Sequence, residues 1–518
     1  MLAYFETCLA RGVKAVDAKA VGYITRIVGL TLEARGINLA LGGRCIVGDI
    51  DSSSNDNMDD APGDTLEAAN KNTHSRYDNK QSCFEVEVVG FDSEVTYLMP
   101  LRPIASVKPG ARVTPINSSE EVPAGNNLLG RVIDGTGKPL DSKGPLGLCD
   151  KIKFHPDAIN PLLRKPISEP LDVGVRSVNA SLTIGCGQRV GLFAGSGVGK
   201  SVLLGMMTRF TEAEVVVVAL VGERGREVRE FVETNLGNEG MAKTIVVAAP
   251  ADETPVMRLR AGMYAARLSE YFRDQGKRTL LLFDSLTRYA QAQREIALAT
   301  GEPPATRGYP PSVFARLPQL VERAGNGVGD GGSVTAFYTV LVEGDDLSDP
   351  VADAARAILD GHIVLSRDIA GQGIYPAIDI QASISRSMTA IVEAPHLMAA
   401  NQVKQLYSRY EQSKDLISVG AYTAGVDPIT DLAIERQPQI QAFLSQSLDE
   451  AVNMQDSVRD LMSILETKDQ AQAGQNQVDQ SNPTTVFQGG RNNQGATIVQ
   501  DETIEQNNVN GGASIANR

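Results

Sequence analysis

The chain of 518 residues is long enough for two to four domains, and its hydrophobic content of 42% is ordinary for a globular protein. A net charge of −14 argues against a general nucleic-acid-binding surface, and no apolar run reaches the ~18 residues of a membrane span. Five isolated cysteines without a CxxC pair argue against a zinc site and fit a reducing cytoplasm, and the first residues lack the basic and apolar regions of a signal peptide.

The first 105 residues predict a short amphipathic segment followed by a small β-barrel. Residues 1–20 carry an apolar stripe at helical spacing, which suits an amphipathic helix and equally a frayed terminus. Residues 21–105 hold four short candidate strands with glycines between them: 23–28, 44–47, 84–88 and 95–98. A polar, acidic stretch at residues 51–82 interrupts them and is almost free of large apolar side chains. We therefore expect a barrel domain that carries a flexible insertion.

The rest of the chain predicts a connecting segment, an α/β domain, a helical domain and a tail. Residues 106–165 are rich in proline and glycine, which is typical of a connection. Residues 166–387 alternate apolar strands with helical stretches, the pattern of a parallel sheet covered by helices; the candidate strands are 188–193, 214–220, 244–248, 278–284, 334–341 and 362–366. Residues 388–465 carry helical apolar stripes, whereas glutamine, asparagine and small polar residues dominate 466–518. We expect a helical C-terminal domain and a disordered tail.

Residues 194–201 have the composition and the position of a phosphate-binding loop. The loop follows a candidate strand and precedes an apolar helix, and it consists of Ala194, Gly195, Ser196, Gly197, Val198, Gly199, Lys200 and Ser201. Its glycines let backbone N–H groups surround an anion, while the start of the next helix adds a positive dipole. Lys200 is placed to reach the β- and γ-phosphates, and the Ser201 hydroxyl to bind Mg²⁺. Alanine stands where the motif usually has glycine, and a residue this small still fits.

Two acidic residues follow other candidate strands and complete a site for hydrolysis. Asp284 ends the apolar run 278–284, so a buried parallel strand would bring its carboxylate beside the loop, where it can hold Mg²⁺ through water. Glu223 lies just past the strand 214–220 and can polarise the attacking water, and Arg224 can meet the charge of the γ-phosphate. For the last two residues, a solvated charge cluster is the alternative. The motifs together predict binding and hydrolysis of ATP with Mg²⁺.

With these motifs placed, residues 20–465 resemble the rotary ATPase family of the F-type ATP synthase alpha and beta subunits. The likeness is strongest to the type III secretion and flagellar export ATPases (FliI-like). Four segments carry it: 192–201 (LFAGSGVGKS), 222–228 (GERGREV), 301–309 (GEPPATRGY) and 376–385 (PAIDIQASIS). The resemblance implies an α/β fold class with an N-terminal small β-barrel, a central RecA-like P-loop parallel α/β domain and a C-terminal helical domain.

The same resemblance implies roles for individual residues. Glu223 would be the catalytic glutamate that orients water, and Arg224 would touch the γ-phosphate. Tyr375 would stack on adenine, with plain packing as the alternative. Arg386 matches the arginine finger, which acts on the nucleotide of a neighbouring subunit, with a structural ion pair as the alternative. Because a finger works only across an interface, Arg386 implies a ring, and the family suggests six identical subunits.

By resemblance, the chain is an ATP-hydrolysing motor that energises export of flagellar proteins through a type III secretion apparatus. The implied partners are further copies of itself in a homohexamer, a FliH-like stator or regulator, a FliJ-like central stalk, the export gate, chaperones and exported flagellar subunits, with no nucleic acid. The implied location is the cytoplasm, peripheral to the inner membrane at the export apparatus.

Three other functions compete with this one. The motor motifs leave open a virulence-type (injectisome) secretion ATPase. A non-catalytic nucleotide-binding ring subunit would usually carry glutamine in place of Glu223, so the carboxylate argues against it. An RNA helicase would need basic and aromatic residues on the barrel, where this chain instead has an acidic insertion.

Overall fold

The computed structural model describes residues 21–48, 83–104, 106–116, 120–342 and 349–466. All of them except Glu466 belong to one unit of the chain. The predicted amphipathic segment 1–20, the insertion 51–82 and the tail beyond Glu466 lie outside the described residues, so those three expectations stay predictions.

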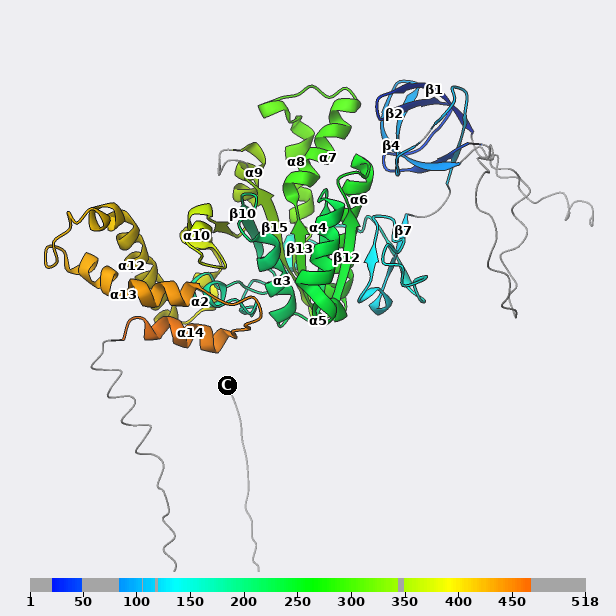
Figure 1. Cartoon of the computed structure of the whole chain (residues 1–518). Helices are drawn as coiled ribbons and strands as arrows, with labels where there is room; N and C mark the ends of the chain where they lie inside the picture. Colours follow the sequence, from blue (N-terminus) through cyan, green and yellow to red (C-terminus); the bar gives the residue numbers. More distant parts are fainter. Residues whose placement is uncertain (1–20, 49–82, 105, 117–119, 343–348, 467–518) are drawn as a thin grey trace, which may run out of the picture. The chain divides into compact units, whose positions relative to one another are not determined.

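The N-terminal domain is a closed β-barrel with the strand order β1-β2-β5-β4-β3-β6 (Figure 1). Its strands are β1 (Gly22–Val28), β2 (Thr31–Arg35), β3 (Arg44–Val47), β4 (Phe84–Asp92), β5 (Val95–Pro100) and β6 (Arg112–Pro115). Alternate side chains point inward and form a small apolar core that includes Ile24, Leu98 and Val113. The four predicted strands are confirmed. Val47 pairs directly with Phe84, so the ladder is continuous on both sides of the insertion.

The barrel extends past residue 105, into the segment that we expected to be a connection. Strand β6 pairs with both β1 and β3 and thereby closes the barrel. Its four residues follow Pro109 and Gly110 and end in Pro115, so no run long enough to show alternation marks this strand in the sequence. Closure depends on partners that are distant in the sequence.

The remainder of the expected connection also pairs with other strands. Strands β7 (Glu121–Ala124) and β9 (Asp150–Lys153) form a two-stranded sheet, and β8 (Val132–Ile133) adds an edge strand to the central sheet beside β12. The short 3₁₀ helix η1 (Asn126–Leu128) lies between β7 and β8, and a second one, η2 (Pro161–Leu163), follows β9. This segment therefore belongs to the body of the protein.

The central domain is built on a sheet that has nine strands in the described residues, in the order β17-β16-β10-β15-β13-β11-β12-β8 with β14 beside β15. The strands are β10 (Arg189–Ala194), β11 (Val215–Val221), β12 (Thr244–Ala249), β13 (Arg278–Asp284), β14 (Gly325–Asn326), β15 (Ser333–Leu341), β16 (Gly361–Leu365) and β17 (Ile378–Ser385). The pairings are parallel except those of β14 and β17. The six strands predicted for this domain are confirmed to within a residue or two.

Helices cover both faces of this sheet (Figure 1). Alternate residues of β11 enter two different cores, because successive strand residues point to opposite faces. One face packs against α6 (Pro255–Asp274), α7 (Leu286–Ala299), α8 (Pro311–Val321) and α9 (Pro350–Ile358). The other packs against α2 (Arg176–Ser181), α3 (Lys200–Phe210), η3 (Phe231–Leu236) and α5 (Gly237–Ala242). The described residues of the domain also include three short helices: α4 (Gly225–Glu230), η4 (Thr306–Gly308) and α10 (Arg367–Gly371).

The C-terminal domain is helical, as predicted. It consists of α11 (Met388–Ile391), α12 (Ala394–Ser418), α13 (Pro428–Leu444) and α14 (Met454–Ser463). Buried His396 contacts the carbonyl of Ala180 at 2.7 Å, and Arg176 pairs with Glu450 at 2.5 Å, so this domain contacts α2 near both of its ends. None of the helices in the described ranges is long and apolar enough to cross a membrane.

Candidate active site

The predicted phosphate-binding loop connects β10 to α3 at the carboxyl edge of the parallel strands. Gly197 and Gly199 have φ values of 80° and 90°, a region that residues with a side chain rarely adopt. Helix α3 begins at Lys200, so its unpaired N–H groups face the loop. Seven of the eight loop residues line an open pocket of about 960 Å³, and the eighth, Val198, is buried beneath them.

Two carboxylates meet Lys200 in this pocket. Asp284 is the last residue of β13, and Glu223 follows the end of the neighbouring strand β11. The Lys200 Nζ lies 2.6 Å from Asp284 Oδ1 and 3.4 Å from Glu223 Oε1. The structure thus brings together the three side chains on which the prediction of hydrolysis rests.

The electrostatics of this cluster suit a group that exchanges a proton near neutral pH. Burial raises the pKa of Glu223 to about 7, and the nearby Asp284 carboxylate adds to the rise while Lys200 opposes it. Burial by itself would lower the pKa of Lys200, but the charges of Asp284 and Glu223 raise it overall. Lys200 therefore stays cationic, and Glu223 can change its charge in the range where a general base is most effective.

A buried threonine that the sequence analysis missed holds Asp284 from the other side. Thr339, in the middle of β15, is fully buried, and its hydroxyl lies 2.6 Å from Asp284 Oδ1. Since β13 and β15 are adjacent parallel strands, this contact follows from their register. A single threonine within an apolar strand gives no signal of such a role unless the pairing of the two strands is known.

Several cationic side chains line the same pocket. Arg224 does so, as predicted, with a side chain that is 83% exposed and pairs with Glu227 at 3.3 Å. Three further arginines were missed: Arg258, Arg288 and Arg367. Each lies in the first turn of a helix that begins at this edge of the sheet. That position after a strand was a usable signal, because helices that follow parallel strands start at the ligand-binding edge.

The structure places Tyr375 and Arg386 at opposite edges of the sheet. The ring of Tyr375 is partly exposed and lies against the loop, where a Cβ added to Gly199 would come within 3.6 Å of it. Arg386 follows β17, whose last residue pairs with the first residue of β16, at the amino edge of the parallel strands. Arg386 is exposed, and its guanidinium donates to the Arg356 carbonyl at 3.3 Å. It does not reach the pocket of its own subunit.

Comparisons with known proteins match this arrangement. Residues 174–385 fit the family described as ATP synthase alpha/beta family, nucleotide-binding domain, and residues 392–463 fit the T3SS EscN ATPase C-terminal domain. The flagellum-specific ATP synthase of Pseudomonas aeruginosa is 58% identical over 86% of this chain and 93% of its own length. The chain belongs to the family of flagellar and type III secretion ATPases. The predicted family and the predicted ATPase activity are thereby confirmed.

Two solved structures of this ATPase family are similar over most of the chain. The assembled ATPase EscN of the enteropathogenic E. coli type III secretion system has a TM-score of 0.75 and is 38% identical over 86% of this chain and 100% of its own. EscN in complex with its central stalk EscO gives a TM-score of 0.73 at 37% identity, with the same shares of the two chains. The predicted succession of barrel, nucleotide domain and helical domain is thus shared with an ATPase of known structure.

The residues present at the loop fit a magnesium ion. No group of three or more His, Cys, Asp or Glu side chains in the described parts of the chain is arranged as a metal site. An ATPase of this kind needs fewer protein ligands, because Mg²⁺ keeps several waters and also takes phosphate oxygens. Ser201 and Lys200 line the pocket and Asp284 contacts Lys200, so a hydroxyl and a carboxylate could supply the hard oxygen ligands that Mg²⁺ prefers.

Proposed function

We propose that this ATPase is the motor subunit that energises export of flagellar proteins through a type III secretion apparatus. The observation that carries the proposal is the convergence of Lys200, Glu223 and Asp284, in a chain 58% identical to a flagellum-specific ATP synthase. A virulence-type role is the second candidate, because the Type 3 secretion system ATPase of Xanthomonas euvesicatoria is 42% identical over 89% of this chain and 98% of its own length. The lower identity places it second.

The chemistry follows from the charges in the pocket. Lys200 moves away from Asp284 and Glu223 and binds the β- and γ-phosphates, and Arg224 adds positive charge beside these phosphates. Glu223 in its ionised form accepts a hydrogen bond from the attacking water and takes its proton as the oxygen bonds to the γ-phosphorus. The bond from the γ-phosphorus to the bridging oxygen breaks at the same time, and ADP leaves. Ser201 and Asp284 would hold Mg²⁺, which supplies charge neutralisation at the phosphates. Tyr375 would offer its ring to the adenine.

We further propose that catalysis requires a ring of identical subunits. Arg386 lies at the sheet edge opposite its own phosphate loop and is exposed there, which suits an arginine that reaches the nucleotide of a neighbour. A head-to-tail ring places this edge of one subunit against the loop edge of the next. Six copies are proposed, by likeness to the family of the assembled EscN.

The proposed partners follow from the same likeness. EscN has been solved with its central stalk EscO, and we propose a corresponding FliJ-like stalk for this chain. A FliH-like regulator, the export gate, chaperones and exported flagellar subunits are proposed with it. Work at the export gate would place the protein in the cytoplasm, at the inner surface of the membrane.

The role in export is tested in a strain of the source organism that lacks this gene. Complementation with the wild type should restore secretion of hook and filament proteins into the medium, whereas Glu223→Gln should not. Glu230→Gln, an exposed glutamate on α4, is the matched control and should restore export fully. Normal flagellar export in the deletion strain, together with loss of secretion from an injectisome, would assign the second candidate function.

The ring is tested by mixing two inactive variants, Glu223→Gln and Arg386→Ala. Some interfaces of a mixed ring then pair an intact glutamate with an intact arginine, so ATP hydrolysis should return. Mixed rings are verified by co-purification of two different affinity tags. Verified mixed rings without activity would show that Arg386 does not act on a neighbouring subunit.

A further inference from the structure

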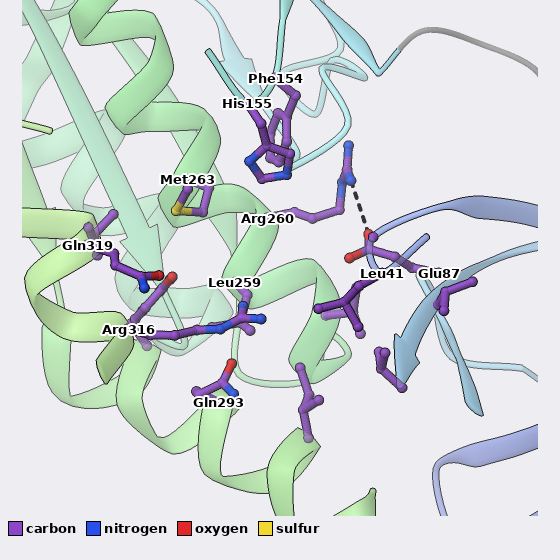
Figure 2. A pocket seen from close by; sticks show the side chains of 17 residues that line it. Leu41, Glu87, Phe154, His155, Leu259, Arg260, Met263, Gln293, Arg316 and Gln319 are labelled. Carbon is purple, nitrogen blue, oxygen red and sulfur yellow. Dashed lines mark hydrogen bonds and ion pairs between the residues drawn. The ribbon is translucent and has the colours of Figure 1, made fainter. Parts of the chain in front are cut away.

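A second cavity lies between the barrel and the nucleotide-binding domain (Figure 2). Its volume is about 280 Å³, which holds roughly nine groups the size of a water molecule. The barrel contributes Leu41 and Glu87, and the central domain contributes residues of α6, α7 and α8. The cavity is separate from the nucleotide pocket at the phosphate loop, and the two have no lining residue in common.

One of the two arginines in this cavity is fully neutralised. Arg260 is buried, with Glu87 at 3.0 Å and Glu120 at 2.9 Å, and its guanidinium lies 4.4 Å from the centre of the Phe154 ring. Figure 2 shows the Arg260–Glu87 contact as a dashed line. Two carboxylates and an aromatic face neutralise this charge, so Arg260 joins the barrel to α6, and its Nε is left without a hydrogen-bond partner.

The other arginine has no such partner. Arg316, on α8, is half-buried, and within the described residues it makes neither an ion pair nor a hydrogen bond. In Figure 2 its side chain extends into the pocket, toward Leu259. Its positive charge extends into the cavity: burial lowers the pKa of His155, and Arg323, Arg260 and, least of the three, Arg316 lower it further against the opposing charge of Glu120. A guanidinium that is partly removed from water without a counter-charge costs stability unless something else binds to it.

A buried acceptor lies in the same cavity and is also unsatisfied. Gln293, on α7, is 5% exposed, and its Oε1 has no hydrogen-bond partner, while its Nε2 has only Ser312 at 3.5 Å. Buried polar atoms are almost always paired, so an orphan of this kind in a cavity indicates a missing partner. The remaining walls are largely apolar, with Leu259, Met263 and Ile296 among them.

We propose that this cavity is a binding site for a small organic anion. A carboxylate or phosphate group of the ligand pairs with Arg316 through two parallel hydrogen bonds. An N–H or O–H group donates to Gln293 Oε1, and an apolar body of about the size of a benzene ring packs on the aliphatic walls. The ligand satisfies the two unpaired groups of the cavity at once. This site does not depend on the proposed export function.

The cavity shares two helices with the nucleotide pocket. On α6, Arg258 lines the nucleotide pocket and Leu259 lines the cavity. On α7, Glu295 lines the nucleotide pocket and Gln293 lines the cavity. Arg258 and Glu295 form an ion pair at 2.6 Å that ties the two helices together. A ligand that displaces α7 relative to α6 therefore changes the wall of the nucleotide pocket, and its binding should alter the affinity for ADP.

Ligand-observed NMR of the full-length protein tests the site, with saturating ADP and Mg²⁺ present so that anions do not enter the phosphate loop. The probes are 4-hydroxybenzoate and phenyl phosphate, and uncharged 4-hydroxybenzamide is the control for shape. We expect the anions to bind and the amide to bind at least about tenfold more weakly. Preference between the two anions identifies the acidic group. Absence of binding by both anions, or equal binding of the amide, would overturn the proposal.

Arg316→Met tests the residue, since it removes the charge and keeps an apolar stem. The variant should lose anion binding and, without ligand, should unfold at the same temperature as the wild type or higher, because an uncompensated charge has been removed. Arg229→Met, at an exposed position outside the cavity, should change neither property. A clear loss of thermal stability in Arg316→Met would instead indicate a structural role. In the wild type, an ADP affinity that does not respond to bound anion would refute the coupling through α6 and α7.

Discussion

Replacing Glu223 with glutamine should stabilise the nucleotide-free protein at alkaline pH. Its pKa is about 7 in the folded chain, against 4.5 for an unperturbed glutamate. When folding raises the pKa of a group, that group stabilises the folded protein at pH values below the pKa that it has in the unfolded chain. This stabilisation is lost as the pH rises through the pKa of the group in the folded protein. At ~1.4 kcal/mol for each tenfold change, the full effect is about 3 kcal/mol. The neutral amide of Glu223→Gln avoids this loss and can still accept a hydrogen bond from Lys200.

Urea unfolding of the two proteins at two pH values measures the effect. The sequence pI is about 5.0, so the series starts at about pH 5.5 to keep the protein in solution. Between about pH 5.5 and pH 8.5 the free energy of unfolding of the variant, relative to the wild type, should grow by about 2 kcal/mol. This is less than the full effect, because the wild type has already lost part of the stabilisation at about pH 5.5. The chain has no tryptophan, so far-UV circular dichroism follows the unfolding.

Glu230→Gln serves as the matched control, since this exposed glutamate lies outside the pocket, and its stability difference from the wild type should not vary with pH. A constant difference between Glu223→Gln and the wild type across the pH range would refute the argument. So would a variant that is less stable than the wild type at the higher pH. Either result would mean that Glu223 is ionised without cost in the folded protein.

Three further substitutions test other contacts of the site. Lys200→Ala should lower ATP turnover by at least about 100-fold in a protein that still folds, and near-normal turnover would refute the assignment of the loop. Thr339→Val should weaken the Mg²⁺-dependent part of ADP binding by about tenfold, since Asp284 loses its hydroxyl partner, whereas Thr339→Ser should bind ADP like the wild type. Calorimetry with and without Mg²⁺ measures the affinity of both variants. Equal losses in the two would count against a role for the hydroxyl. Tyr375→Ala should raise KM for ATP with little change in kcat, and a fall in kcat alone would exclude a role in binding.

Much of this fold follows from local sequence signals. Strands such as β11 and β13 are unbroken apolar runs, and burial on both faces requires such runs in a parallel sheet. The loop at Lys200 follows the end of one strand and Asp284 ends another. Because the carboxyl ends of parallel strands lie at the same edge of a sheet, this was enough to predict that the two residues are close. These elements could be predicted because each one is specified within about ten residues of sequence.

The features that could not be predicted depend on pairing between distant segments. Strand β6 is recognisable only beside β1 and β3, and the hydroxyl of Thr339 meets Asp284 only through the register of β15 on β13. The missing partner of Arg316 is a further case, because nothing in the sequence of a helix shows that one of its arginines lines a cavity. Sequence reasoning identified Lys200, which we propose to bind phosphate, and the two carboxylates that neutralise it, and it missed Thr339, which positions Asp284.

The charges at the loop also link nucleotide binding to proton uptake. Lys200 compensates two carboxylates in the nucleotide-free state, and its transfer to the phosphates removes that compensation. Glu223, with a pKa already near 7, would then take up a proton unless a divalent cation restores positive charge beside Asp284. Binding of nucleotide alone should therefore leave Glu223 protonated and unable to accept a proton from water. We expect that only nucleotide bound together with Mg²⁺ keeps Glu223 ionised. The cluster that holds Lys200 would then prevent hydrolysis from starting on nucleotide without its metal ion.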